Sequence, residues 1–402
     1  MRIVFVNLHT NEFLVKTASK YIFKQSIAIK HKYFLDYLLS RDDIEVCSYV
    51  NKKGTSIASN LPGFFMKLLI ACRFLESKWI LKKNHLKGKI KILKHLDDIK
   101  QDDIVILHQH YADKSEDVKD IEAFKVVSML HFHGTQSNSK AIQNCKPDII
   151  IGEANLNKYC KLFQKYYSWA TNKKFLVHPF VFEPRFKRQK PFSERINKVF
   201  STGTITYKKH PEFIDVYGDP CDQPIRKYAF DHKDELSDIL DCYNSDYSEN
   251  ANSKLMPTGK ENKFIYYIKA FYYKFFASQQ KSYYSFNMVE KFNDYKMCLI
   301  GEEILGIPGI GFVEGMACGC AYIGQTAGFY EDYGMIEGKH YIGYDGTPED
   351  LIAKIKYYQL LENQSALEQI ANNGYEFVQT HCIGEIAAKK LLDLILQEAT
   401  KK

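Results

Sequence analysis

The sequence lacks long hydrophobic runs. No apolar stretch reaches the ~18 uninterrupted residues that a membrane-spanning helix needs, so no segment is predicted to span a membrane. The apolar run at residues 1–9 is too short for the hydrophobic region of a signal peptide. It predicts instead the first buried strand of a sheet.

Paired cysteines are also missing. The ten cysteines include no C-x-x-C pair, and only Cys318 and Cys320 lie close together in the sequence. This spacing favours reduced, packed thiols in the cytosol over a disulfide framework or a zinc site. His108, His110 and His131 invite a zinc interpretation, but no Cys or carboxylate at ligand spacing completes a tetrahedral site. We therefore predict no metal site.

Several catalytic and nucleic-acid-binding motifs are absent. The chain has no Walker loop, no His-Glu-x-x-His and no Ser-His-Asp order, so hydrolase and phosphotransferase functions lack a starting residue. No Asp-x-Asp is present to bring a divalent metal. The net charge of +7 admits nucleic acid, but the lysines are spread along the chain without a recognisable binding motif. A phosphate-rich small ligand and an anionic membrane account for the same charge.

What the chain does contain is an alternation of short apolar runs and amphipathic stretches, typical of parallel strands joined by crossover helices. Its 402 residues, 45% of them hydrophobic, suit about two domains with sizeable cores. Strands are predicted at residues 3–8, 44–50, 104–109, 126–131, 148–152, 174–179, 198–203, 296–301, 321–324 and 340–344. Helices are predicted at residues 20–39, 154–167, 348–361, 366–380 and 384–399. The predicted fold class is α/β, with two Rossmann-like domains facing a cleft.

A basic, proline-containing passage at residues 183–191 interrupts this alternation, and we interpret it as an interdomain linker. It separates a first domain at residues 1–185 from a second at residues 192–383. The remaining residues, 384–402, form a final helix.

The most informative segment is Gly311-Phe-Val-Glu-Gly-Met-Ala-Cys-Gly-Cys-Ala-Tyr-Ile-Gly324. It places Glu314 just inside a helix that small residues allow to pack tightly. The preceding Gly306-Ile-Pro-Gly-Ile-Gly311 is a glycine-rich turn whose backbone N–H groups suit an anion. A phosphate fits the turn, and a sugar hydroxyl fits the carboxylate.

This segment resembles the nucleotide-binding signature of GT-B glycosyltransferases. Glu314-Gly-Met-Ala-Cys-Gly319 is similar to the Glu-Ala-Met-Ala-Cys-Gly of the large retaining glycosyltransferase family 4, also called glycosyl transferases group 1. The resemblance implies that Glu314 binds the donor ribose and that Gly309, Ile310, Gly311 and Phe312 lie against the donor diphosphate. It also implies an N-terminal acceptor-binding domain, a C-terminal nucleotide-sugar-binding domain and a C-terminal helix that crosses back to the N-terminal domain.

One departure from the family concerns the transferred sugar. The family usually carries a second Glu eight residues before the first, in contact with that sugar, and this chain has Gly306 there. Glu302 and Glu303 lie nearby at a different spacing. The identity of the sugar and the retaining outcome are therefore left open.

A second resemblance lies in the first domain. His133-Gly-Thr-Gln136 follows a predicted strand and is similar to a His-Gly-Thr-Asp found at a strand end in several of these transferases. The match implies that His133 reaches the donor sugar or the transition-state charge. The alternative is a histidine that hydrogen-bonds locally at a strand end.

The start of the second domain, Val199-Phe-Ser-Thr-Gly-Thr-Ile-Thr-Tyr-Lys-Lys-His-Pro211, is a strand, a glycine turn at Gly203 and Thr204, and then cations. By resemblance, Lys208 and Lys209 are candidates to neutralise the departing diphosphate. Arg226 is the alternative cation, because a guanidinium binds phosphate bidentately. Solvated surface lysines are the competing interpretation.

Two segments combine aromatic and apolar residues with lysines, at 61–94 and 263–276. Such segments suit an anionic membrane surface, which an enzyme acting on a lipid-linked glycan would need. Apolar positions at helical spacing also occur in protein cores. We favour core packing for 263–276 and leave both interpretations open for 61–94.

The sequence thus predicts a cytoplasmic glycosyltransferase of the EC 2.4 class, hexosyl or related, that moves a sugar from a nucleotide-sugar donor to a glycan or lipid-linked acceptor. It looks like the divergent bacterial members that build surface polysaccharide, such as lipopolysaccharide or capsule, in peripheral contact with the inner face of the membrane. No cofactor is expected, because the nucleotide-sugar is a substrate. The alternatives are a nucleotide-sugar epimerase of the same fold and a non-catalytic nucleotide-sugar-binding module, for which Gly306 is the main argument.

Overall fold

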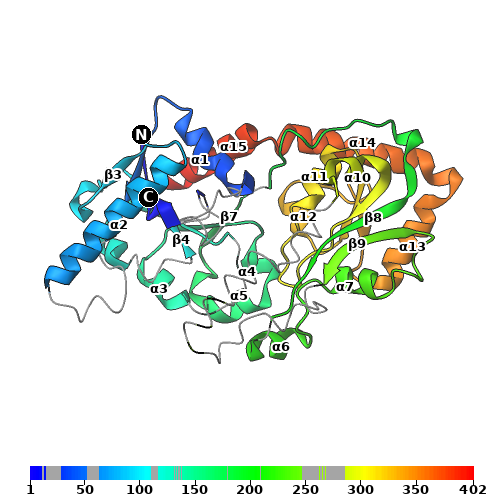
Figure 1. The fold of residues 1–402 in the computed structure, drawn as a ribbon, viewed down its shortest axis with the longest axis horizontal. Helices are drawn as coiled ribbons and strands as arrows, with labels where there is room; N and C mark the ends of the chain where they lie inside the picture. Colours follow the sequence, from blue (N-terminus) through cyan, green and yellow to red (C-terminus); the bar gives the residue numbers. More distant parts are fainter. Residues whose placement is uncertain are drawn as a thin grey trace. The chain divides into compact units, whose positions relative to one another are not determined.

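The protein consists of two compact units (Figure 1). The computed structural model describes residues 1–10, 13–14, 29–51, 63–109, 116–130, 132, 134, 136, 138–178, 180–208, 210–246, 262, 265, 268 and 286–402. The first unit comprises Met1–Glu183 together with Thr380–Lys402, and the second comprises Pro184–Gln379.

The first unit is built on a seven-stranded sheet in which every pairing is parallel, in the order β3-β2-β1-β4-β5-β6-β7. Its strands are β1 (Arg2–Val6), β2 (Glu45–Tyr49), β3 (Lys91–Leu93), β4 (Ile104–His108), β5 (Phe124–Ser128), β6 (Ile149–Gly152) and β7 (Lys174–Val177). All residues of β4, β5 and β6 are buried. Such fully buried, largely apolar strands are typical of a parallel sheet with both faces covered.

The helices of the first unit are α1 (Ile29–Leu39), α2 (Gly63–Lys83), α3 (Ser139–Asn144), α4 (Leu156–Tyr159), α5 (Lys161–Tyr166) and α15 (Gly384–Ala399). Helix α15 lies beside α1, although the two are far apart in sequence (Figure 1). Its apolar stripe, which includes Ala387, Leu391 and Ile395, belongs to the same core as Phe34 and Leu38 of α1. The last helix thus completes the first unit.

The second unit has a five-stranded parallel sheet in the order β12-β11-β10-β8-β9. Its strands are β8 (Ile196–Ile205), β9 (Leu240–Asp246), β10 (Tyr295–Leu299), β11 (Ala321–Gln325) and β12 (Ile342–Tyr344). Numbered within the unit, the order is 2-1-3-4-5, so the direction of winding reverses between β8 and β10. In open α/β sheets, ligands bind outside the carboxyl ends of the strands at such a switch point.

Helices α6 (Pro211–Tyr217), α7 (Pro224–Asp231), α10 (Met288–Asp294), α11 (Gly311–Ala317), α12 (Phe329–Asp332), α13 (Pro348–Gln359) and α14 (Gln364–His381) follow these strands. Helix α13 shows how local sequence sets an end: Thr347 accepts a hydrogen bond from the Asp350 backbone N–H, and Pro348 occupies the first turn.

The predicted α/β class with two parallel sheets is confirmed. The sequence analysis did not predict two of the strands, β3 and β9. Strand β3 is three residues long, and β9 is an edge strand with few apolar residues. The predicted helix at residues 154–167 is broken into α4 and α5 at Cys160, and the first part of the predicted helix 20–39 lies outside the described residues.

The ten cysteines are free thiols, and Cys72 alone among them is exposed. Burial raises the pKa of Cys47 and Cys221 to about 11, so both thiols stay protonated. Within the part of the chain that the structure describes, no helix is both long enough and apolar enough to cross a membrane.

Candidate functional site

A buried arginine joins the two strands that flank the switch point of the second unit. Arg226, on α7, donates from Nη1 to the carbonyl oxygen of Thr204 in β8 (2.8 Å) and from Nη2 to that of Gly301 (2.8 Å). Its Nε donates to the carbonyl oxygen of Ile300, directly after β10 (2.5 Å). A guanidinium carries five N–H groups in a fixed fork, so this one side chain can hold both strand ends.

Glycines line the space around this guanidinium. A Cβ on Gly203 would lie 2.7 Å from Arg226 Nε, and one on Gly309 would lie 2.8 Å from Arg226 Nη2 and 2.7 Å from Ile300 Cγ2. The structure therefore brings the predicted residues Gly203, Thr204, Arg226 and Gly309 together at one point. It also gives the two glycines a packing role.

A second buried group, the carboxylate of Glu302, holds the loop that follows β10. The carboxylate of Glu302 accepts hydrogen bonds from the hydroxyls of Tyr322 (3.1 Å), Tyr330 (2.6 Å) and Tyr344 (3.1 Å) and from the backbone N–H of Gln325 (3.0 Å). Burial, together with the Glu302 charge, raises the pKa of all three tyrosines well above the usual range. Their hydroxyls therefore remain protonated donors.

The loop then turns sharply at Gly306. The backbone N–H of Gly306 donates to Glu303 O (2.8 Å), and that of Glu303 donates to Ile307 O (3.0 Å). The φ angle of Gly306 is +73°, in the left-handed region that favours glycine. A glutamate at this position, as in family 4, would be strained in this turn.

Helix α11 carries Glu314, whose side chain is half-buried, whereas its neighbours on the packed face are buried. Gly315 lies against the sheet: a Cβ there would be 2.5 Å from Cys298 Sγ and 3.1 Å from the ring of Phe292. The glycine that replaces the alanine of the family signature therefore lets α11 approach β10 closely.

Replacing Gly315 with alanine is expected to lower the free energy of unfolding by about 1–3 kcal/mol, because the added methyl group overpacks a closed interface. Urea denaturation followed by circular dichroism measures the loss. Ser365→Ala, at an exposed position of α14, is the control, because the substitution neither adds a methyl group to a closed interface nor strains the backbone. Equal losses in the two variants would contradict the packing role of Gly315.

Lys208 forms an ion pair with a buried aspartate. Its Nζ lies 3.0 Å from Oδ2 of Asp222, and the carbonyl oxygen of Asp222 accepts from the backbone N–H of Ile304 (2.7 Å). The other carboxylate oxygen of Asp222, Oδ1, is buried without a hydrogen-bond partner. The predicted cation is thus tied to the loop that follows β10.

The predicted residues Ile310, Gly311 and Phe312 lie at the start of α11. The Phe312 ring is buried against Tyr322, Tyr330 and Tyr333. Its backbone N–H donates to Gly309 O (3.2 Å), so the first turn of α11 uses this donor itself. Ile310 immediately precedes α11, and the buried Gly311 begins it.

His133 and Lys209 lie outside the described residues, as do His110, His131 and most of the segment 263–276. Their predicted roles stay predictions. Around the described residues, no group of three or more His, Cys, Asp or Glu side chains gathers at metal-binding distance.

Sequence reasoning missed a set of polar residues at the carboxyl edge of the first sheet. His9, Gln109, Glu153 and His178 are all buried there, each at or shortly after the end of a strand. His9 Nε2 lies 4.0 Å from Glu76 Oε2, and His178 Nδ1 is 3.0 Å from the hydroxyl of Tyr33. A survey of polar residues at or just after the ends of the predicted strands would have found them.

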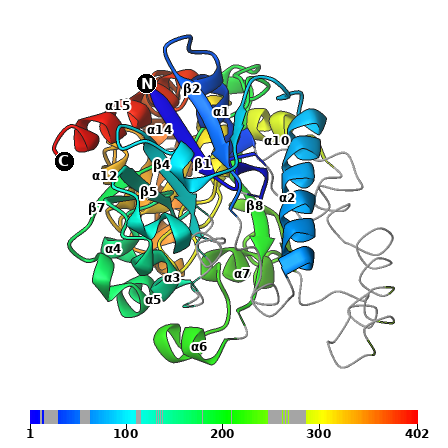
Figure 2. The ribbon, with the colours of Figure 1, turned by 90° about the vertical axis from the view of Figure 1, so that its left-hand side faces the viewer.

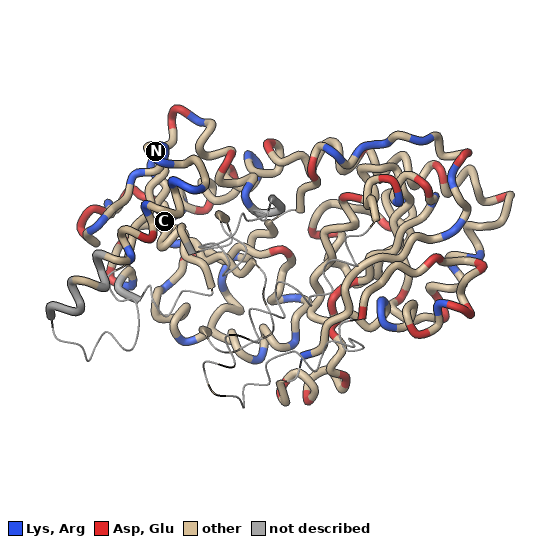
Figure 3. The backbone as a smooth tube through the Cα atoms, in the orientation of Figure 1, with Lys and Arg blue, Asp and Glu red and all other residues tan. Residues whose placement is uncertain are grey.

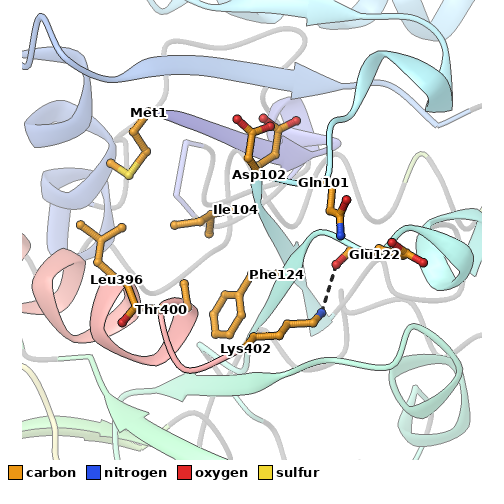
Figure 4. Close-up of a pocket in the computed structure, with 11 residues that line it drawn as sticks. Met1, Gln101, Asp102, Ile104, Glu122, Phe124, Leu396, Thr400 and Lys402 are labelled. Carbon is orange, nitrogen blue, oxygen red and sulfur yellow. Dashed lines mark hydrogen bonds between the residues drawn. The ribbon is translucent and has the colours of Figure 1, made fainter.

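A cavity of about 540 Å³ opens at the opposite, amino edge of this sheet (Figure 4). Met1, Ile104 and Phe124 lie on its strand side, and Leu396 and Lys402 close it from the chain's end. None of the predicted site residues lines it.

Comparisons with known proteins decide the fold. No family model and no curated protein sequence matches the chain. Among solved structures, the chain is similar to HepE of Anabaena in complex with UDP, at 11% identity and a TM-score of 0.51 over 99% of this chain and 100% of that one. It is also similar to sucrose-phosphate synthase of Thermosynechococcus elongatus, at 11% identity and 0.52 over 100% of both chains. The fold is GT-B. The chain is also similar to the N-terminal domain of Candida albicans trehalose-6-phosphate phosphatase, at 11% identity and a TM-score of 0.54 over 99% of this chain and 97% of that one.

Proposed function

We propose that the protein is a glycosyltransferase that takes its sugar from a nucleotide-sugar donor bound at the switch point of the second unit. The observation that carries the proposal is the meeting of Thr204, Gly309 and Arg226 at that point, where ligands of such sheets bind. Glu314 would hold the ribose hydroxyls. The diphosphate would lie along residues 309–312, with Lys208, Lys209 or Arg226 as its cation.

His133 would approach the donor from the first unit, whose proposed role is acceptor binding. The proposed acceptor is a glycan or lipid-linked glycan in bacterial surface polysaccharide synthesis. An enzyme with such an acceptor would work in the cytoplasm, in peripheral contact with the inner face of the membrane. Preorganised charge of this kind is usually the largest catalytic term, so no metal ion is required by the proposal.

Turnover separates this function from its alternatives. The purified chain is incubated with UDP-, GDP-, ADP-, CMP- and dTDP-sugars, with and without a bacterial lipid extract as acceptor, and free nucleotide is measured. UDP-sugars are tested first, because the similar HepE structure is a complex with UDP. We expect one donor class to release nucleotide faster when acceptor is present.

Two other results would contradict the proposal. Conversion of one nucleotide-sugar into another without acceptor would identify an epimerase. Nucleotide binding without release or conversion would identify a non-catalytic module, for which the turn at Gly306 is the structural argument.

A further inference from the structure

Helix α2 is apolar on two opposite faces. One face packs into the first unit, where Ser77, Ile80 and Leu81 are buried. The opposite face leaves large apolar side chains in solvent: Leu68 is 52% exposed, Leu75 is 62% exposed and Trp79 is 44% exposed. Scattered apolar residues are normal on protein surfaces, but a row of them on one helix needs a reason.

These exposed side chains form a continuous stripe. Leu68, Cys72, Leu75 and Trp79 follow one another at spacings of four, three and four residues, which places them on one side of a helix. Cys72 is also exposed. The stripe is about 16 Å long, from the rise of about 1.5 Å per residue. Figure 2 shows α2 running along the outside of the first unit.

The surroundings of the stripe are strongly basic. Residues 72–94 contain eight Lys and Arg but a single acidic residue, Glu76. Lys78, Lys82 and Lys87 are exposed. Figure 3 shows Lys and Arg interspersed with acidic residues over most of both units, so the shortage of acidic residues sets this segment apart.

A hollow of about 490 Å³ lies between α2 and the segment that leads into β3. Apolar side chains line it, including Leu81, Ile90 and Ile92, and the three lysines at positions 78, 82 and 87 line it as well. An apolar recess with ammonium groups around it fits an anionic headgroup together with the upper part of its acyl chains.

We propose that this face of α2, the α2 surface (Leu68, Cys72, Leu75, Lys78, Trp79 and Lys82), binds a membrane that contains anionic phospholipids. Leucine and tryptophan enter the boundary between headgroups and acyl chains, where the indole ring is favoured. The lysines contact phosphate groups at the same depth. A nucleic acid would match the charge but leave the apolar stripe in water.

The proposal rests on the proposed function only for the identity of that membrane. Its test is binding of the full chain to vesicles of phosphatidylcholine alone or mixed with phosphatidylglycerol, measured by co-sedimentation. We expect binding to the mixed vesicles that weakens with added salt, because salt screens the lysines. Lys78→Glu with Lys82→Glu is expected to weaken this binding at least tenfold, or about 1.4 kcal/mol. Leu75→Ser with Trp79→Ser is expected to weaken it by about as much.

Matched controls use exposed residues elsewhere. Lys161→Glu with Lys165→Glu reverses two exposed lysines at the same spacing on α5, in the same unit. Leu361→Ser removes a leucine that is 88% exposed in the second unit. Both controls are expected to bind vesicles like the wild type.

Cys72 supplies an independent readout, because the other nine cysteines are buried or half-buried. An environment-sensitive fluorophore on this thiol is expected to shift to the blue with mixed vesicles only. Failure of the wild type to bind mixed vesicles, or equal loss in the α5 control, would overturn the proposal. The melting temperature of every variant is also measured with and without nucleotide. If nucleotide still raises it, the proposed donor site is intact and only the membrane-binding proposal has failed.

Discussion

Replacing Arg226 with methionine is expected to lower the free energy of unfolding by about 3–5 kcal/mol. The substitution removes a buried charge and leaves the carbonyl oxygens of Thr204, Ile300 and Gly301 without their shared donor. Hydrogen bonds to a charged group are worth about 1.5–3 kcal/mol each, and part of that is recovered when the strand ends relax. Urea denaturation gives the loss directly.

The neighbouring Lys227 is the matched control. It lies on the same helix and pairs with Asp231 at the surface (2.7 Å). Its replacement with methionine is expected to lower the free energy of unfolding by less than about 0.5 kcal/mol. Arg226→Lys is expected to fall between the two, because one ammonium cannot reach both strand ends as a planar fork does. A loss for Arg226→Met no larger than for Lys227→Met would mean that Arg226 does not hold the strand ends together.

Glu302→Ala is expected to lower the free energy of unfolding by about 3–5 kcal/mol. The reason is that three tyrosine hydroxyls and one backbone N–H lose their common acceptor inside the protein. Tyr344→Phe removes a single donor and is expected to cost about 1 kcal/mol. Both are measured by denaturation of the full chain.

The adjacent Glu303→Ala is the control for Glu302, since the side chain of Glu303 is only half-buried. If Glu302→Ala and Glu303→Ala had equal stability, the tyrosine cluster would not support the loop. Asp in place of Glu302 offers a finer test: the shorter carboxylate is expected to recover only part of the lost stability, because it cannot reach all three hydroxyls.

Periodicity and turn residues were enough to predict most strands and the α/β class from the sequence. Buried runs such as 104–109 and 148–152 are read easily, because a strand covered on both faces has no polar alternation. The edge strand β9 was missed for the opposite reason, since four of its seven residues are polar and two of those, Asn244 and Asp246, are buried without forming an apolar run. Strand order was also invisible, and the switch point between β8 and β10 depends on it.

The candidate site was predicted in part. Gly203, Thr204, Arg226 and Gly309 do lie together, although the spacing of Arg226 gave no sign that its guanidinium spans two strand ends. Glu302 was set aside in the sequence for its spacing, and the structure gives its carboxylate a supporting role instead.

The two differences from the signature that the sequence resembles have local causes. Gly306 adopts a positive φ in a tight turn, and Gly315 leaves room for Cys298. Neither cause can be read from the signature itself, because both depend on the path of the loop and the neighbouring strand.

The most direct test of the proposed donor site is calorimetric titration of the full chain with UDP, GDP, ADP, CMP and dTDP, followed by the same titration of two variants. Glu314→Ala removes the proposed ribose ligand. Glu368→Ala removes an exposed acid on α14 and serves as the control.

We expect the wild type to bind one nucleotide selectively and Glu314→Ala to bind it about 10- to 100-fold more weakly, as for the loss of a charge-assisted hydrogen bond. Glu368→Ala should bind like the wild type. At 100 times its dissociation constant, the nucleotide should also stabilise the wild type by about 2.7 kcal/mol. Binding of no nucleotide, or equal affinity in Glu314→Ala and the wild type, would contradict the proposed donor site.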